Sequence, residues 1–267
     1  MNNNWGEVND HTSPLFNLKI IEIFMMNLTR QDRQVINNFS LFNKNLEFKK
    51  DLRSISSNNN LIAEYKLESD EFNPFVVYET PEFLKCYNSF LSPKVEILKD
   101  RVLISDHKSE VKFFTAERAI CRLPKKTISE LIKDKIPDTQ LKMSFDNVKS
   151  LQKFIEILKL PNLVIKQDDD NFHSFLITDL KDKKSNEFSI STYQKTNKDY
   201  YCKVPHFYEM PILISNYKVS IFDDEYILLE SLDIPLKYLI ALEPKPQPDS
   251  KEREIIKYYA ENQKRYD

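Results

Sequence analysis

The chain has 267 residues, 41% of them hydrophobic and including 18 Phe and 13 Tyr, which is enough apolar material for one large or two small folded domains. Its net charge is −2, so a generally basic surface is excluded and any DNA contact has to come from a local stripe. Gly6 is the single glycine, which excludes glycine-dependent phosphate loops in the rest of the chain. No apolar run approaches the roughly 20 residues of a membrane span, which argues against a membrane protein.

The first 25 residues lack the basic segment and small-residue cleavage site of a signal peptide. They precede the first repeated segment described below, and we interpret 1–25 as an N-terminal extension. Residues 28–48 open with Thr29, a good helix N-cap, and then carry apolar residues at helical spacing, which predicts an amphipathic helix leading into a strand. The further elements expected in this half are strands over 46–56, 61–67 and 74–78, a shorter helix over 80–91, and a strand, an acidic turn and a strand over 94–104.

The same order recurs in the second half of the chain. Residues 143–163 open with Ser144 and repeat the first helical pattern at a constant offset of 115, from Leu28 to Met143. Residues 218–228 repeat the strand, acidic turn and strand at an offset of 124, from Lys94 to Lys218. Between these matches we expect strands over 163–167, 172–178 and 187–193 and a shorter helix over 204–210. Two matches in the same order favour a duplicated domain.

The duplication predicts an α+β fold with two similar domains, residues 26–124 and 141–243, joined by a charged connector at 125–140. The C-terminal tail, 244–267, begins with regularly spaced prolines that are typical of an extended spacer. Its 251–263 stretch has the composition of a short helix.

No residues that could carry catalysis are visible. Three polar clusters are expected in turns, where Asn and Asp tolerate left-handed geometry and acidic groups stay solvated: Asn58–Asn60, Asp168–Asp170 and Asp223–Glu225. The four histidines have no metal-ligand spacing: His11, His107, His173 and His206. The three cysteines lie far apart and are expected to be reduced thiols of a cytoplasmic protein: Cys86, Cys121 and Cys202. We therefore expect a protein that is not an enzyme and has no metal site and no cofactor.

Four segments stand out: MNLTRQDRQVINNFSLFNKNLEFKK from Met26, the stretch Phe75–Leu84, Asn216-Tyr217-Lys218, and the closing Tyr-Leu-Ile-Ala-Leu-Glu at 238–243. Together they resemble the sliding clamp of T-even-type bacteriophages. Met26 falls where such clamps begin, so residues 1–25 are either an extension or a consequence of the choice of start site. The resemblance covers about 26–243. The chain departs from the family in lacking its turn glycines and in having extensions at both ends.

The resemblance implies a homotrimeric ring with pseudo-sixfold symmetry, helices inside and antiparallel sheets outside. Such a ring encircles double-stranded DNA without reading its sequence, as a processivity factor for a replicative DNA polymerase in the cytoplasm of an infected host cell. The implied partners are that polymerase, a clamp loader and RNA polymerase-associated factors of late transcription.

Basic residues on the predicted helices are the candidates for contact with DNA. The first helix offers Arg30 and Arg33, the helix of the second half Lys142, Lys149 and Lys153, and the shorter helices Lys85 and Lys203. A pocket for partner peptides is expected by analogy near the connector and the closing strand, at Leu123, Ile128, Leu131, Tyr238 and Ile240. Ordinary solvated helix faces and core packing between the domains explain the same residues without these functions.

Two other classes of function stay open. A non-ring processivity factor could hold DNA on an open basic face as a monomer or dimer, given locally segregated charge. A virion or adaptor protein would have no role at DNA at all.

Overall fold

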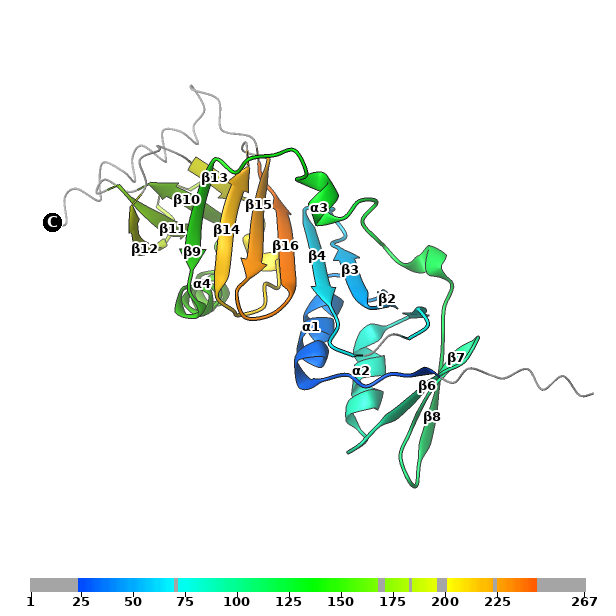
Figure 1. Ribbon diagram of the computed structural model, residues 1–267. Helices are drawn as coiled ribbons and strands as arrows, with labels where there is room; N and C mark the ends of the chain where they lie inside the picture. Colours follow the sequence, from blue (N-terminus) through cyan, green and yellow to red (C-terminus); the bar gives the residue numbers. More distant parts are fainter. Residues whose placement is uncertain are drawn as a thin grey trace, which may run out of the picture.

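The computed structural model describes residues 24–69, 72–167, 171–182, 184–195, 201–222 and 225–243. The C-terminal tail, most of the N-terminal extension and the expected turns at Asp168–Asp170 and Asp223–Asp224 lie outside these residues. The described chain forms an arc of antiparallel sheets, with the α-helices α1, α2 and α4 along one side (Figure 1).

One order of elements occurs twice. The first half runs β1 (Phe24–Met25), α1 (Arg30–Ser40), β2 (Leu46–Phe48), β3 (Asp51–Ile55), β4 (Leu61–Lys66), β5 (Phe75–Val77), α2 (Thr80–Asn88), β6 (Lys94–Ile97), β7 (Arg101–Ser105) and β8 (Glu110–Phe114). The second half runs β9 (Thr139–Met143), α4 (Phe145–Leu158), β10 (Asn162–Gln167), β11 (Phe172–Thr178), β12 (Phe188–Lys195), β13 (Tyr201–Val204), the 3-10 helix η2 (Phe207–Glu209), β14 (Tyr217–Phe222), β15 (Tyr226–Ser231) and β16 (Leu236–Ala241). The connecting segment holds η1 (Arg118–Ile120) and α3 (Ile128–Leu131). The α+β fold with two similar halves is confirmed.

The expected helix over 204–210 is wrong. Residues 201–204 form the strand β13, and the helical part shrinks to η2. Proline disfavours α geometry in the residue before it, and here Pro205 and Pro211 confine the segment from both ends. Met210 is accordingly extended, with φ −98° and ψ 105°, and His206 is left-handed, with φ 51°.

Both long helices begin where the sequence predicts. Thr29 caps α1 and Ser144 caps α4, each through a capping box with the residue three positions later. The turn between β3 and β4 is also as expected, because Asn59 takes the left-handed geometry with φ 59°.

Asp32 connects the start of α1 to the sheet behind it. Its carboxylate is fully buried and accepts hydrogen bonds of 3.0 Å from Thr29 (backbone N–H and Oγ1), from the Tyr65 hydroxyl and from the backbone N–H of Glu68. A buried carboxylate is tolerated only when its lone pairs are satisfied, as they are here. The same contacts fix the position of α1 against β4.

A six-stranded sheet in the order β3-β4-β16-β15-β14-β9 joins the two halves. Strand β4 of the first half pairs antiparallel with β16 of the second, from Leu61 opposite Ile240 to Tyr65 opposite Leu236. Along one face of this junction the side chains are buried in a core that runs through both halves. The remaining strands form two four-stranded sheets, β1-β6-β7-β8 and β12-β11-β10-β13, and the pair β2-β5.

Tyr238 links the halves a second time, inside the core. Its buried hydroxyl donates to Asn38 Oδ1 of α1 over 2.6 Å and accepts from the backbone N–H of Leu213 over 3.3 Å. Asn38 in turn donates to the carbonyl of Pro211 over 2.6 Å. Burial raises the pKa of Tyr238, so the hydroxyl stays protonated and keeps donating.

We expect Tyr238→Phe to lower the free energy of unfolding by about 1–3 kcal/mol, because it leaves the buried Asn38 Oδ1 and the partly buried Leu213 N–H without this partner. Denaturant unfolding followed by circular dichroism measures the change. Tyr78→Phe is the matched control, since that ring is 56% exposed. Equal stability of the two variants would contradict a structural role for this hydrogen bond.

Candidate nucleic-acid interface

The two arginines expected to face DNA lie on the outward side of α1. Arg30 is exposed, while Arg33 is half-buried. Arg33 donates from Nη1 to Asn88 Oδ1 over 3.1 Å, and its guanidinium carbon lies 5.8 Å from the centre of the Tyr87 ring. Both partners belong to the last turn of α2, so Arg33 holds α1 and α2 side by side. Its positive charge stays on the helical face.

Helix α4 presents Lys149 and Lys153 on the side away from its buried stripe, and α2 presents Lys85. The basic residues of α1, α2 and α4 are Arg30, Arg33, Lys85, Lys149 and Lys153, and the acidic residues apart from the buried Asp32 are Glu82, Asp146 and Glu156. Over these three helices the excess of positive charge is small, which favours weak attraction of phosphates over a tight binding site.

Two of the expected DNA-facing lysines lie elsewhere. Lys142 belongs to β9, where its neighbours Leu141 and Met143 point into the core, so Lys142 points to the opposite face of the sheet from α4. Lys203 belongs to β13, is 9% exposed, and forms an ion pair of 2.7 Å with Glu243. Their assignment to helices is wrong, because a strand precedes α4 and another replaces most of the expected helix over 204–210.

The connector packs on the face of the six-stranded sheet that is turned away from the helices. Ile128 of α3 is buried against Phe222, Leu228 and Leu239, with Leu131 packed beside it, in a cluster separate from the main core. A capping box between Thr127 and Glu130 begins α3. The connector is therefore held as part of the outer surface.

Contacts to both halves fix the ends of the connector. The backbone N–H of Ile128 donates to Glu64 Oε1 of β4 over 2.8 Å. Lys135 forms an ion pair of 2.5 Å with Glu225 and lies 5.2 Å from the centre of the Tyr226 ring. The segment thus spans the junction of the halves on the outside, as α1 does on the inside.

The structure does not bring the five expected pocket residues together. Ile128 and Leu131 lie on the outer face, whereas Tyr238 and Ile240 are buried in the main core. Leu123, half-buried, belongs to neither cluster. The sequence prediction missed Leu239, which lies in the same cluster as Ile128. The alternation of side chains along β16 puts Leu239 on the opposite face from Tyr238 and Ile240, and this alternation could have identified it from the sequence.

A row of charged side chains crosses the outer face of the six-stranded sheet. Adjacent strands pair its members in the order Arg53, Glu64, Lys237, Glu230, Lys218 and Lys142. Lys237 and Glu230 form an ion pair of 2.8 Å. Beside α3 this row borders a cavity of about 560 Å³ whose lining includes Arg53, Thr127 and Lys237. The outer face is thus polar where the connector leaves it uncovered.

Within the described residues, no group of three or more His, Cys, Asp or Glu side chains could hold a metal ion. In the same part of the chain, no helix is long and apolar enough to cross a bilayer.

Comparisons with solved structures identify the architecture. The proliferating cellular nuclear antigen of Entamoeba histolytica aligns with a TM-score of 0.60 at 12% identity, over 83% of this chain and 98% of that one. A. fulgidus PCNA, solved with the C-terminal region of FEN-1, aligns with a TM-score of 0.59 at 11% identity, over 84% and 100%. The Helicobacter pylori beta clamp aligns with a TM-score of 0.57 at 15% identity, over 85% of this chain and 66% of that one.

This chain has the sliding-clamp fold. It spans nearly the whole length of the PCNA chains and about two thirds of the beta clamp. No protein-family model and no curated protein matches the sequence, so the fold is visible in the structure but not in overall sequence similarity. In this clamp fold the element that differs most between the halves is the second helix, which is α2 in one and the short η2 in the other.

The shortened helix leaves a groove on the helical side of the clamp fold. It has a volume of about 840 Å³ and lies between α1 and α4, with the segment from Phe207 to Ser215 along it. Its lining includes Gln34, Asn37 and Gln152 and the carboxylates of Glu156 and Glu209. None of the basic residues described above lines it, so the positive charge lies beside the groove and not within it.

We expect Ile128→Ala to lower the free energy of unfolding by about 2–4 kcal/mol, because Ile128 is 1% exposed and its loss opens a cavity between connector and sheet. Ile136→Ala is the matched control in the same connector, since Ile136 is 84% exposed and its loss should cost less than about 0.5 kcal/mol. Denaturant unfolding measures both. Similar values would mean that α3 is not held against the sheet.

Proposed function

We propose that this chain is the subunit of a sliding clamp, a non-enzymatic ring of three copies that encircles duplex DNA and tethers a replicative DNA polymerase. The observation that carries the proposal is the duplicated half with helices on one side and sheets on the other. Three such chains supply six similar halves, and their helices then line one central channel.

Ring closure uses a junction that each subunit already contains. Within the chain, β4 pairs with β16 across the boundary between the halves. The repeated order makes β12 the counterpart of β4 and β8 the counterpart of β16. In the described chain β12 and β8 are edge strands of their sheets and lie at opposite ends of the arc (Figure 1). Pairing β8 of one copy with β12 of the next repeats the internal junction between subunits.

The helical face suits a ring that slides. A closed ring stays on DNA because of its topology, so the lining needs only enough positive charge to offset the phosphates it passes. The small basic excess of α1, α2 and α4 meets this need, and backbone contacts of this kind carry no sequence information.

Partner proteins, in this proposal, dock on the outer face around the connector. The A. fulgidus PCNA structure contains the bound C-terminal region of FEN-1, so a protein with this fold binds a terminal segment of a partner protein. Here the apolar patch at Ile128 and Leu131 and the cavity beside Arg53 are the surfaces available near the connector. The sequence motifs of T-even-type phage clamps suggest a phage polymerase, its clamp loader and late-transcription factors as the partners.

We expect light scattering coupled to gel filtration to give a particle of about three times the subunit mass of 31.8 kDa. A mass that stays at one subunit at micromolar concentration would contradict a self-standing ring. It would favour an open processivity factor that holds DNA on the same helical face.

We also expect Lys149→Ala with Lys153→Ala to reduce the slope of log K for binding a short linear duplex against log salt concentration by about 2, since each lost phosphate contact removes about 0.9. The matched control is Lys142→Ala with Lys218→Ala, two lysines on the opposite face of the sheet. Fluorescence anisotropy at several salt concentrations measures both slopes. Equal effects of the two pairs would contradict a DNA-facing role for α4.

A further inference from the structure

The edge strand β8 has two distinct faces. Val111 and Phe113 are half-buried on the side of the helices, where Phe113 lies edge-on to Phe83 of α2 with ring centres 5.5 Å apart. Glu110, Lys112 and Phe114 are exposed on the other side.

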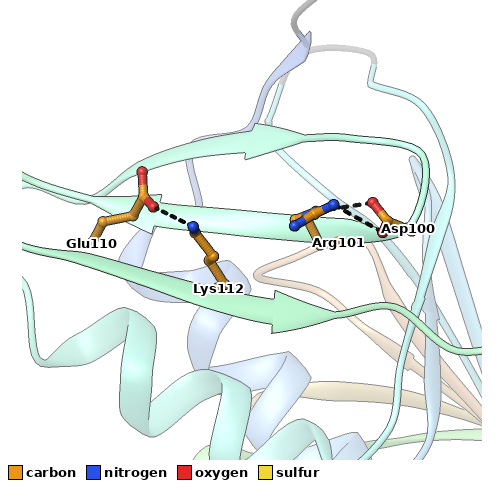
Figure 2. A network of polar contacts seen from close by, with 4 residues as sticks. All are labelled: Asp100, Arg101, Glu110 and Lys112. Atoms are coloured by element: carbon orange, nitrogen blue, oxygen red, sulfur yellow. Dashed lines mark hydrogen bonds and ion pairs between the residues drawn. The ribbon is translucent and has the colours of Figure 1, made fainter.

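The outer face of this edge is charged. Lys112 lies 3.8 Å from Glu110 and Arg101 lies 2.9 Å from Asp100, and Figure 2 shows both ion pairs along β7 and β8. Charges on an edge strand discourage indiscriminate pairing, so a partner strand has to fit them.

The edge strand β12 has the same two faces. Phe188 stacks on Phe154 of α4 with ring centres 3.8 Å apart, and Ile190 packs against the main core. Both are half-buried, as Val111 and Phe113 of β8 are. Ser189 and Ser191 lie on the opposite, outer face.

A β-bulge interrupts β12 after Ser191. Ser191 pairs with Ser174 of β11 but Lys195 pairs with Phe172, so three residues of β12 face one of β11. Within the bulge Tyr193 is left-handed, with φ 54°, and 82% exposed. Left-handed geometry costs a tyrosine about 1–2 kcal/mol, so other contacts must hold it.

Gln194 provides such contacts. Its side chain accepts from the backbone N–H of Lys142 over 2.7 Å and donates to the Lys142 carbonyl over 2.6 Å. Thr192 adds a hydrogen bond of 3.0 Å from Oγ1 to the carbonyl of His173. These contacts attach the C-terminal end of β12 to β9. The residues of β12 before the bulge keep regular strand geometry.

We propose that the bulge at Tyr193 and the two hydrogen bonds of Gln194 set the register of the contact between subunits, with β8 of one copy pairing antiparallel with Glu187–Ser191 of the next. This proposal rests on the ring function. Continuous sheets keep helix-side residues opposite helix-side residues, so Val111 and Phe113 have to meet Phe188 and Ile190 rather than the serines.

Among the registers that obey this rule, only one pairs both Val111 and Phe113 with apolar residues of β12 before the bulge. It puts Phe113 opposite Phe188, Val111 opposite Ile190 and Lys112 opposite Ser189. The half-buried apolar side chains of both edges then cover one another, and the small serines leave room for the Glu110–Lys112 ion pair. A slip of two residues would place Val111 opposite Thr192 and force Glu110 onto Tyr193 inside the bulge.

Paired cysteines on the exposed outer face test the register in the full chain. We expect Lys112→Cys with Ser189→Cys to form covalent species of two and three subunits under mild oxidation, read on a non-reducing gel. Lys112→Cys with Ser191→Cys is the matched control, displaced by two residues on the same face. We expect at least a tenfold lower yield from it, since diagonal neighbours lie about 7–8 Å apart and a disulfide needs less than about 7 Å between Cα atoms.

Further variants distinguish a wrong register from the absence of a ring. The unsubstituted chain, with Cys86, Cys121 and Cys202, should give no covalent species. Adding Gln194→Ala to the Ser191→Cys variant should raise its yield severalfold, because the stop at the bulge is lost. A trimer that links mainly through Ser191→Cys, or through neither pair, overturns the register and leaves the ring intact. A monomeric mass for all variants overturns the ring itself.

Discussion

Five register pairs between β4 and β16 turn two similar halves into one body. Without this ladder each half would end in an exposed edge, and the halves could turn relative to one another about the connector. With it, the buried face of a single sheet carries α1 on one half and α4 on the other, so both helices are held at fixed positions on the same side. The hydrogen bond from the Tyr238 hydroxyl to Asn38 stabilises the same junction inside the core. The connector stabilises it on the outer face.

The junction also separates the two faces of the molecule by the alternation of a strand. Along β16, Tyr238 and Ile240 point toward the helices and Leu239 and Lys237 point away from them. The helical side can therefore carry a weak positive charge while the outer side carries alternating charges and the connector. A protein with a net charge of −2 can in this way present a weakly basic surface on one side, because its charges are distributed unevenly between the two faces.

How far the sequence predicted this arrangement depended on whether the signal was local. The N-caps Thr29 and Ser144 and the repeated helical spacing gave both long helices, because caps and periodicity act within a few residues. Lys142 was assigned to the wrong element because β9 is only five residues long and its strand character comes from pairing with β14, far away in the chain. Lys203 was assigned wrongly for a similar reason, since two prolines and a partner in β10 outweigh the helical pattern of 204–210.

The pocket residues show the same limit at finer scale. The sequence indicated that the connector and the closing strand are close, but the choice of face on β16 depends on a register that no local pattern fixes. Register also matters at the edge strand β12, where it determines how a partner strand can pair. The bulge in β12 costs local strain at Tyr193, yet it ends the regular part of the strand and turns Gln194 toward β9. A strained, specific stop on an otherwise simple edge is what a surface needs if it is to accept one partner strand in one register and refuse others.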